Sequence, residues 1–292
     1  VPVKNTSGTV SWKAIFGNGY NSVNGQAALY VVDIGSGTVQ VITAVEAAAP
    51  AGSNGLGNIV VIDRWGGASL NTTVRDCYAD TVYAADQKGA LWKFDLRSPT
   101  PASPAAPVFI AQDPADSGIR QPILGGLTAA FGPGGGIMVY FGTGSFSFVN
   151  DSDPANNQVQ SMYAVNDRGG STTLTRADLH EHTITSDVDG VAQVSSTPMA
   201  IGKSGWRIDL PAGERSVGYP QIANGIVFYP TYDPEASAGC TGNGSNRLFG
   251  LNALNGSAGL AFVRVGSPAG SPFAAGTGAI PLNTGGSAPV KD

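Results

Sequence analysis

Two histidines one residue apart are the first side chains in this sequence that could do chemistry. His180 and His182 flank Glu181 in the segment HEH. Side chains at positions i and i+2 of a β-strand share one face, so the two imidazoles could chelate a transition metal there. No third or fourth ligand is evident nearby in the sequence. We therefore favour the interpretation that these are exposed polar residues on an outer strand.

Two acidic segments resemble fragments of calcium loops. Residues 187–190 read DVDG and residues 150–153 read NDSD. Neither segment has the carboxylate at the ninth or twelfth position that a calcium loop uses. Turns stabilised by Asn and Asp side chains explain both segments without an ion.

Sequence motifs for catalysis are missing. The chain has no GxSxG elbow, no P-loop, no GxGxxG that follows a strand, and no CxxC pair. The two histidines lie almost next to each other, which leaves few choices for a general base. We therefore predict that the protein is not an enzyme.

A repeated strand–turn–strand unit is the element that must position any site. Each copy has an apolar strand ending in Gly, Asn, Asp or Pro, a connection of variable length, and a strand ending in a polar turn. The copies span residues 13–37, 80–96, 138–170 and 226–257. Their equivalent aromatic residues are Tyr30, Trp92, Tyr163 and Phe249, at intervals of about 60 to 90 residues.

Repetition of an all-β unit at this length predicts a β-propeller. We expect a modified, incomplete propeller with four to five blades, formed by residues 1–257. Residues 258–292 are rich in Gly, Pro and Ser and form either a tail or a partial blade. The chain opens directly on a strand-like segment, so we expect part of a larger protein, whose ring is completed by upstream sequence or by another chain.

Composition limits the classes of function. The 292 residues include 41 Gly and 19 Pro, only 13% are charged, and the net charge is −5. This balance disfavours nucleic-acid binding and binding to anionic membranes, because no basic cluster is present. No apolar stretch of about 20 residues could span a bilayer. Cys77 and Cys240 permit one disulfide, but the sequence does not decide whether they pair.

The repeats resemble the carboxy-terminal propeller of the PilC/PilY-type adhesins and biogenesis factors of type IV pili. The resemblance is carried, in order, by residues 16–34, 80–96, 139–167 and 205–220, followed by 247–256. It implies a surface-exposed protein at the pilus tip or outer membrane. Such a protein supports pilus extension against retraction and attaches to cells or surfaces. The implied partners are other tip components or minor pilins, and a host or abiotic surface.

The resemblance also implies a calcium loop before the strand at 81–86. Asp63 matches the first position of the family pattern, and Asp76 and Asp80 match its last two positions. The second aspartate has no counterpart, and residues 64–75 interrupt the middle of the loop. Either Ca²⁺ still binds through these three carboxylates and backbone carbonyls, or the insert and Cys77 brace the loop in its place.

We expect the module to act by binding, through the loops 64–78, 145–160 and 233–246, because the strands are committed to blade packing. Trp65 lies in the insert and is either an exposed adhesive residue or packed on its own blade. Two other functions remain open: a quinone-dependent periplasmic dehydrogenase, and a purely structural scaffold of a cell-surface assembly.

Overall fold

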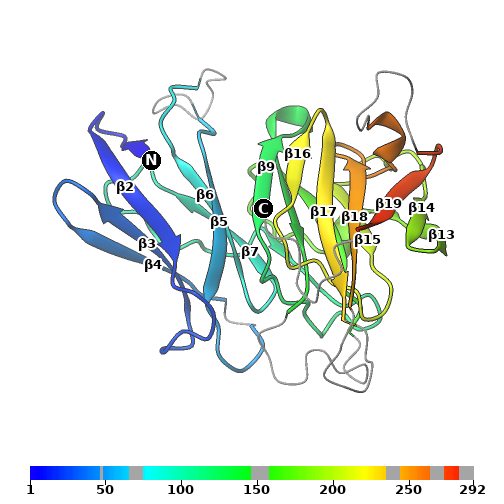
Figure 1. Ribbon diagram of the computed structural model, residues 1–292. Helices are drawn as coiled ribbons and strands as arrows, with labels where there is room; N and C mark the ends of the chain where they lie inside the picture. The colour runs from blue at the N-terminus through cyan, green and yellow to red at the C-terminus, as the bar shows by residue number, and fades with distance from the viewer. Residues whose placement is uncertain (47–48, 66–74, 146–157, 235–243, 264–272, 283–292) are drawn as a thin grey trace. The chain divides into compact units, whose positions relative to one another are not determined.

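The computed structural model describes the chain except for residues 47–48, 66–74, 146–157, 235–243, 264–272 and 283–292. Its regular structure is almost entirely β-strand, as Figure 1 shows, so the all-β prediction is confirmed. Within the residues that the structure describes, the helices are single turns of 3₁₀ helix, and none is long and apolar enough to cross a membrane. They are η1 (Pro133–Gly135), η3 (Arg176–Asp178) and η4 (Leu260–Phe262).

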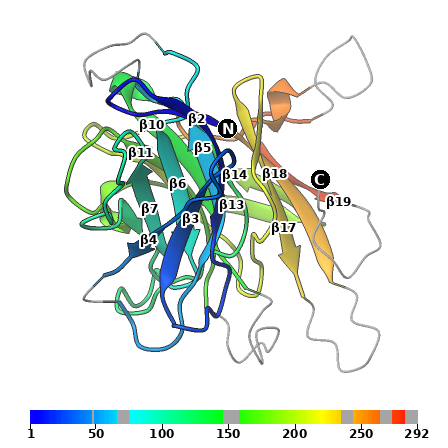
Figure 2. The ribbon, with the colours of Figure 1, turned by 90° about the vertical axis from the view of Figure 1, so that its left-hand side faces the viewer.

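The chain divides into two compact units. The first unit comprises residues 1–110 and 170–173 and contains two antiparallel sheets, each with its four strands in chain order (Figure 2). The first sheet consists of β1 (Pro2–Lys4), β2 (Val10–Gly17), β3 (Ala27–Asp33) and β4 (Val39–Ala44). The second sheet consists of β5 (Leu56–Ile62), β6 (Thr81–Asp86), β7 (Ala90–Asp95) and β8 (Phe109–Ile110).

The second unit comprises residues 111–169 and 174–292 and contains two larger sheets. The third sheet has the order β12 (His180–His182), β15 (Gly205–Asp209), β11 (Ser161–Asp167), β10 (Ile137–Gly142) and β9 (Leu127–Phe131). The fourth has the order β13 (Ile184–Val188), β14 (Val191–Val194), β19 (Thr277–Leu282), β18 (Ser245–Asn252), β17 (Ile226–Asp233) and β16 (Gln221–Ala223). The segment 258–292 therefore contributes a strand, β19, to this sheet.

The four predicted copies are one antiparallel strand pair in each sheet. These pairs are β2–β3, β6–β7, β10–β11 and β17–β18. Tyr30, Trp92 and Phe249 each lie three residues before the Asp or Asn that ends the second strand, whereas Tyr163 lies four residues before Asp167. Tyr30 lies opposite Phe16, Trp92 opposite Ala84, Tyr163 opposite Phe141 and Phe249 opposite Tyr229. The repeat in the sequence is thus a repeat in the structure.

The polar turn that ends each copy also has one physical cause. The second strand ends in Asp or Asn, whose side-chain oxygen accepts a backbone N–H two or three residues later and so closes an Asx turn. The pairs are Asp33 with Ser36, Asp95 with Arg97, Asp167 with Gly169 and Asn252 with Leu254.

Each unit has its own core of sheet packed on sheet. In the first unit, Leu29 and Val31 of the first sheet pack with Trp92 and Phe94 of the second sheet. Strand β6 (TVYAAD) is buried along its whole length. This explains why its sequence is apolar on both faces, whereas β2 alternates between exposed and half-buried residues.

In the second unit the same arrangement recurs with different residues. Met162 and Ala164 of the third sheet pack with Phe249 and Leu251 of the fourth. The side chains of Trp206 and Tyr229 lie in this core with ring centroids 6.1 Å apart, and both rings are fully buried. Aromatic residues therefore supply much of the buried apolar area that stabilises the sheet pair.

Candidate functional site

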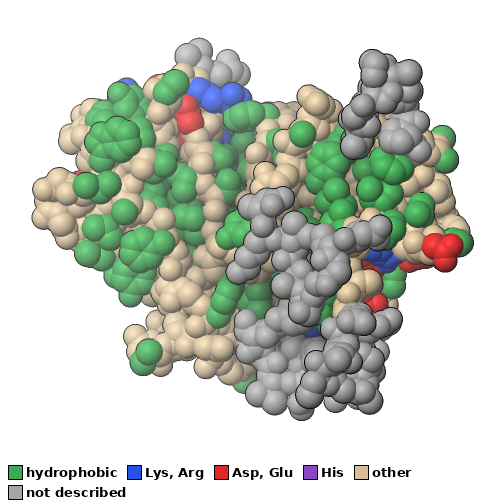
Figure 3. Space-filling view, in the orientation of Figure 1, with side chains coloured by type: hydrophobic (Ala, Val, Ile, Leu, Met, Phe, Trp, Pro, Cys, Tyr) green, Lys and Arg blue, Asp and Glu red, His purple; other side chains and the backbone are tan. Residues whose placement is uncertain are grey.

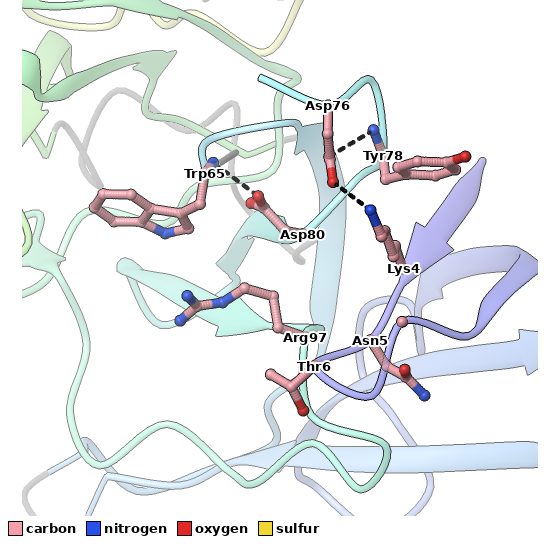
Figure 4. A pocket seen from close by; sticks show the side chains of 9 residues that line it. Lys4, Asn5, Thr6, Trp65, Asp76, Tyr78, Asp80 and Arg97 are labelled. Carbon is pink, nitrogen blue, oxygen red and sulfur yellow. Dashed lines mark hydrogen bonds and ion pairs between the residues drawn. The ribbon is translucent and has the colours of Figure 1, made fainter. Parts of the chain in front are cut away.

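One cavity in the first unit brings together acidic, basic and aromatic side chains (Figure 4). Its volume is about 250 Å³. The lining comes from four separate segments: the end of β1 and the turn after it, the start of the insert at Trp65, the segment before β6, and Arg97 two residues after β7. The lining residues are Lys4, Asn5, Thr6, Gly8, Trp65, Asp76, Tyr78, Asp80 and Arg97.

Asp80 organises the floor of this cavity. Its carboxylate accepts hydrogen bonds from the backbone N–H groups of Trp65 (2.7 Å) and Arg64 (3.1 Å). The hydroxyl of Thr81 donates a third, at 2.7 Å. Burial raises the pKa of Asp80, and the nearby charge of Asp63 acts in the same direction. These bonds fix the chain at the point where the 66–74 segment begins.

Asp76 is directed toward the first strand. Its Oδ2 lies 3.3 Å from Lys4 Nζ, and its Oδ1 accepts the backbone N–H of Tyr78 at 3.3 Å. The same ammonium lies 5.3 Å from the centre of the Tyr78 ring. Lys4 therefore ties the segment before β6 to β1, as Figure 4 shows. Because both side chains of the ion pair are partly exposed, the pair contributes little to stability.

Trp65 is half-buried, and two guanidinium groups lie near its ring. Arg64 lies 4.8 Å and Arg97 6.0 Å from the ring centre, within the range of cation–π attraction. Arg97 in turn binds the carboxylate of Asp95 through two nitrogens. The Trp65 ring therefore packs against its own blade, as one of the two interpretations requires. Its role in binding a partner stays a prediction.

The charges of the cavity largely compensate one another. Lys4 is paired with Asp76 and Arg97 with Asp95, while the carboxylate of Asp80 is occupied by hydrogen bonds. Such a cavity can recognise a partner through hydrogen bonds and ring contacts, but it offers no strong net field to steer a charged ligand.

The calcium prediction can be compared with the positions of its three carboxylates. Asp63 Oδ2 accepts the backbone N–H of Cys77 at 2.8 Å, whereas its Oδ1 is buried without a hydrogen-bond partner. This orphaned oxygen, together with the raised pKa of Asp80, fits a cation held by Asp63 and Asp80. Asp76 is engaged with Lys4 instead. Within the described ranges no three His, Cys, Asp or Glu side chains form a group that could hold a metal.

Bound calcium would neutralise the charges of Asp63 and Asp80. Two carboxylates are fewer than most protein calcium sites provide, since this ion takes six to eight oxygen ligands. The calcium site therefore remains a proposal, with Asp63 and Asp80 as the residues that would hold the ion.

Cys77 lies beside this group with its backbone in the left-handed region, at φ 65°. Its side chain is exposed. Cys240 lies outside the described residues, so the disulfide between them stays a prediction. The alternative role of Cys77 as a brace rests on its backbone, which donates to Asp63.

The two histidines lie on β12, the edge strand of the third sheet, as predicted for an outer strand. Their rings are 4.8 Å apart. His182 is buried, however, so the expectation that both are exposed is wrong. Its Nε2 donates to the backbone carbonyl of Asn255 at 2.7 Å, and its Nδ1 lies 3.1 Å from Ser195 Oγ. Burial lowers the pKa of His182, and both of its ring nitrogens are engaged in hydrogen bonds within the protein.

The other acidic segment in the described part is a turn. Asp189 and Gly190 both adopt positive φ, at 53° and 77°, in the hairpin that joins β13 to β14. Asp187 pairs with Arg247 of β18. Residues 150–153 lie outside the described residues, as do most of the three loops expected to bind partners.

Sequence reasoning did not anticipate Lys4, Tyr78 or Arg97 in the cavity. Lys4 is 72 residues from its partner Asp76. Tyr78 is the last residue of the expected loop 64–78, and Arg97 directly follows the repeat copy at 80–96, but nothing in their local pattern marks them. The parallel bridge between Val3 and Ala79 brings Lys4 beside Asp76 and Tyr78, and the pairing of β6 with β7 brings Arg97 near Asp80.

Comparison with known proteins places these observations in a family context. A family model described as the PilY1 beta-propeller domain matches residues 3–197. A type IV pilus biogenesis factor PilY1 homolog of Xylella fastidiosa is 37% identical over 325 residues, which cover all of this chain and 21% of that protein. PilY1 of Pseudomonas aeruginosa PAO1 is 25% identical over 294 residues, which cover 84% of this chain and 24% of that protein.

A solved structure agrees with these matches. The crystal structure of the P. aeruginosa PilY1 C-terminal domain superposes with a TM-score of 0.68 at 24% sequence identity. The match covers 88% of this chain and 58% of that one. The chain spans about a fifth to a quarter of the length of the curated relatives named above. Together the family model and the shared fold confirm the propeller prediction.

Proposed function

Because the chain belongs to the PilY1 β-propeller family, we propose that it serves type IV pilus biogenesis as a binding module and not as a catalyst. The observation that carries this proposal is the family match over residues 3–197. Relatives that share the sequence are named as pilus biogenesis factors. Those relatives are much longer, and this chain corresponds to about a fifth to a quarter of their length.

The finer proposal is that the module supports pilus extension against retraction and attaches to cells or surfaces. We place the module at the pilus tip or the outer membrane, with other tip components or minor pilins as its partners. The cavity beside Trp65 supports a binding role, since it presents aromatic rings and hydrogen-bonding groups at the base of a loop. Sheets packed on sheets provide the rigid support that such a loop requires.

A quinone-dependent dehydrogenase is the enzymatic alternative on this fold. It would use a calcium-bound carboxylate base, and Asp63 and Asp80 are the carboxylates that would hold the calcium. Reconstitution with the quinone and Ca²⁺, followed by dye reduction, would reveal such an activity. We favour binding because the names of the relatives point to pilus biogenesis.

The proposed function is tested by replacing the aligned region of P. aeruginosa PilY1 with this chain, in cells that lack their own PilY1. We expect surface pili and twitching motility to be restored. A hybrid protein that is stable and exported but leaves the cells without pili would contradict the proposal.

Deleting a loop distinguishes an adhesive role of the module from a purely structural one. Removal of residues 66–74 keeps Arg64 and Trp65, whose backbone groups bind Asp80, so the fold should persist. We expect normal numbers of pili but weaker attachment. Unchanged attachment, together with no cell binding by the isolated chain, would favour the scaffold.

A further inference from the structure

The connection between β7 and β8 is a proline-rich segment of the first unit. Residues 97–107 read RSPTPASPAAP and form neither helix nor strand. Proline has no backbone N–H to donate and its ring clashes inside a helix, so the four prolines keep this segment out of helices and sheets. After Arg97 the other residues are Ala, Ser and Thr. We call residues 98–107 the proline strap.

Side-chain hydrogen bonds hold the strap against its own unit. Gln40 Nε2 of β4 donates to the carbonyl oxygen of Pro99 at 2.8 Å. Farther along the strap, the hydroxyl oxygens of Thr43 and Ser103 lie 3.2 Å apart. The strap is therefore a fixed feature of the first unit, and its outward side chains are presented to solvent in one orientation.

Burial along the strap has a period of three residues. Pro101 and Pro104 are half-buried and Pro107 is buried, whereas the residues between these prolines are exposed. This is the pattern of a polyproline II segment, which has three residues per turn, so that residues three apart share one face. The strap thus turns a row of prolines toward the protein, and Thr100 and Ser103 share a second row that faces outward.

Among the hydroxyl groups of the strap, that of Thr100 is available for a reaction. Ser98 Oγ donates to the carbonyl oxygen of Thr100 at 3.0 Å and accepts its N–H at 3.2 Å, and Ser103 is engaged with Thr43. The Thr100 side chain is exposed, and no described residue bonds to its Oγ1. Because Pro101 holds the residue before it in an extended conformation, an enzyme can reach this hydroxyl without unfolding the chain.

Segments rich in Ser and Thr with Pro are typical carriers of O-linked glycans. We propose that Thr100 is the acceptor of an O-linked glycan, attached by a glycosyltransferase of the bacterium that makes the protein, and that this glycan shields the strap. The glycan would extend from the outward row and leave the packed row of prolines in place. This inference goes beyond a role in pilus biogenesis and does not depend on adhesion.

The transfer requires an activated sugar, whose anomeric carbon is bonded to a phosphate oxygen of a nucleotide or lipid carrier. Thr100 Oγ1 forms the new bond to the anomeric carbon. The bond between that carbon and the phosphate oxygen breaks, and the phosphate leaves with the bonding electrons. The hydroxyl proton passes to a base of the transferase, and nothing is oxidised or reduced.

Docking of the strap into a partner is less compatible with its burial. Domains that bind polyproline II segments take up proline rings in an aromatic groove. In the strap, however, the rings of Pro101, Pro104 and Pro107 already face the protein. The outward positions carry only small or hydroxyl side chains, apart from Pro99.

A glycan would also supply hydrated surface that the chain itself provides sparingly. Only 13% of the residues are charged, and charged side chains are sparse on the face that Figure 3 shows. Charged groups normally keep an exported protein soluble. Sugar hydroxyls bind water without adding charge and so provide solubility in another way.

Mass spectrometry tests the modification directly. Trypsin releases the whole strap in one peptide, residues 98–120, because Arg97 precedes it and Arg120 ends it. The protein is isolated from the bacterium that encodes it, and the peptide is fragmented by electron transfer, which leaves glycans attached. We expect the mass of at least one sugar residue on Thr100. Ser117, which is exposed in the same peptide but outside the strap, should carry none.

Three results would overturn the proposal. The first is a peptide with the mass of its sequence alone. The second is a phosphate in place of a sugar. The third is a sugar on a serine of this peptide with none on Thr100.

A substitution tests the assignment to one hydroxyl. Thr100→Val removes the hydroxyl and keeps the shape of the side chain, so protein from the same bacterium should lose the added mass. Thr185→Val, at an exposed threonine of β13, is the matched control and should keep it. Wild-type chain produced in a host without the transferase should have the mass of its sequence. A glycan that persists in Thr100→Val would overturn the assignment.

Proteolysis tests the shielding role. A protease that cleaves after alanine should cut the strap of Thr100→Val several times faster than the strap of the glycosylated wild type. The same two proteins made without the transferase should be cut at equal rates, because the substitution leaves the backbone unchanged. Equal rates for the glycosylated and the unmodified wild type would overturn the shielding role.

Discussion

The hydroxyl of Tyr229 donates a 2.7 Å hydrogen bond to the backbone carbonyl of Tyr163. The bond joins the fourth sheet to the third inside the core of the second unit, where both residues are fully buried. Tyr229→Phe removes the donor and leaves the carbonyl oxygen of Tyr163 buried without this hydrogen bond. Because the desolvation penalty of that oxygen is then no longer compensated, we expect the free energy of unfolding to fall by about 1–2 kcal/mol. Urea denaturation measures this. Tyr30→Phe, at a half-buried ring, is the control and should change stability by less than about 0.5 kcal/mol.

Alkaline pH should weaken the same core. Burial raises the pKa of Tyr163 and of Tyr140, and raises that of Tyr229 well above the usual value. Unfolded tyrosines lose their proton near pH 10, whereas these stay protonated in the folded state. Above pH 10 the unfolded state therefore binds fewer protons, and stability falls as the pH rises.

Tyr140, which stays protonated in the folded protein at pH 11, should by itself cost about 1.4 kcal/mol of stability at that pH. Urea midpoints at pH 8 and pH 11 report the loss. In the Tyr140→Phe variant, the loss of stability between pH 8 and pH 11 should be smaller than in the wild type by the contribution of this one tyrosine. A fall identical to that of the wild type would show that Tyr140 ionises normally in the folded protein.

The buried ion pair between Glu214 and Arg247 should be sensitive to the loss of one partner. Arg247 Nε lies 3.0 Å from Glu214 Oε1, a second contact joins Nη2 to Oε2, and Glu214 is 2% exposed. Glu214→Ala would leave the guanidinium with Asp187 alone, so we expect a loss of about 3–5 kcal/mol. Thermal unfolding provides the measurement.

Glu181→Ala is the matched control for that experiment. Glu181 pairs with Arg207 at 2.8 Å, but its side chain is 50% exposed. Exposed pairs contribute about 0.2–1 kcal/mol, so this variant should unfold close to the wild-type temperature. Equal losses in the two variants would mean that burial does not decide the strength of these pairs.

The sequence predicted those parts of the fold that have a local signal. The copy expected at 80–96 is formed by β6 and β7, and the copy expected at 138–170 contains β10 and β11. These segments are short apolar runs between turn residues, and the turns are closed by side chains close in sequence. Asp86, for example, accepts the backbone N–H groups of Lys88 and Ala90.

Features decided by distant residues could not be predicted in this way. β19 lies in a segment rich in Gly, Pro and Ser, and it becomes a strand because β18 and β14 pair with it on its two sides. His182 is buried and donates a hydrogen bond from Nε2 to the carbonyl oxygen of Asn255, 73 residues away in the sequence. In the cavity, the ion pair of Lys4 and Asp76 depends on the pairing of strands and leaves no trace in local sequence.

Calcium should stabilise the first unit through Asp63 and Asp80 and not through Asp76. The buried Asp63 Oδ1 has no hydrogen-bond partner and lies near a carboxyl whose pKa is raised by burial and by Asp63 itself. A cation there would relieve both penalties. With only two carboxylates we expect a Kd of about 1 mM, within the range of extracellular calcium modules. At 10 mM CaCl₂ this corresponds to about 1.4 kcal/mol of stabilisation.

The measurement is the Tm with and without CaCl₂ at constant ionic strength, with MgCl₂ as the control salt. Asp63→Asn and Asp80→Asn should each abolish the calcium-dependent rise. Asp76→Asn should keep it, because Asp76 is paired with Lys4. If CaCl₂ does not change the Tm of the wild type, Asp63 and Asp80 do not bind calcium and are fixed by their hydrogen bonds alone. A rise lost only in Asp76→Asn would mean that the ion displaces Lys4.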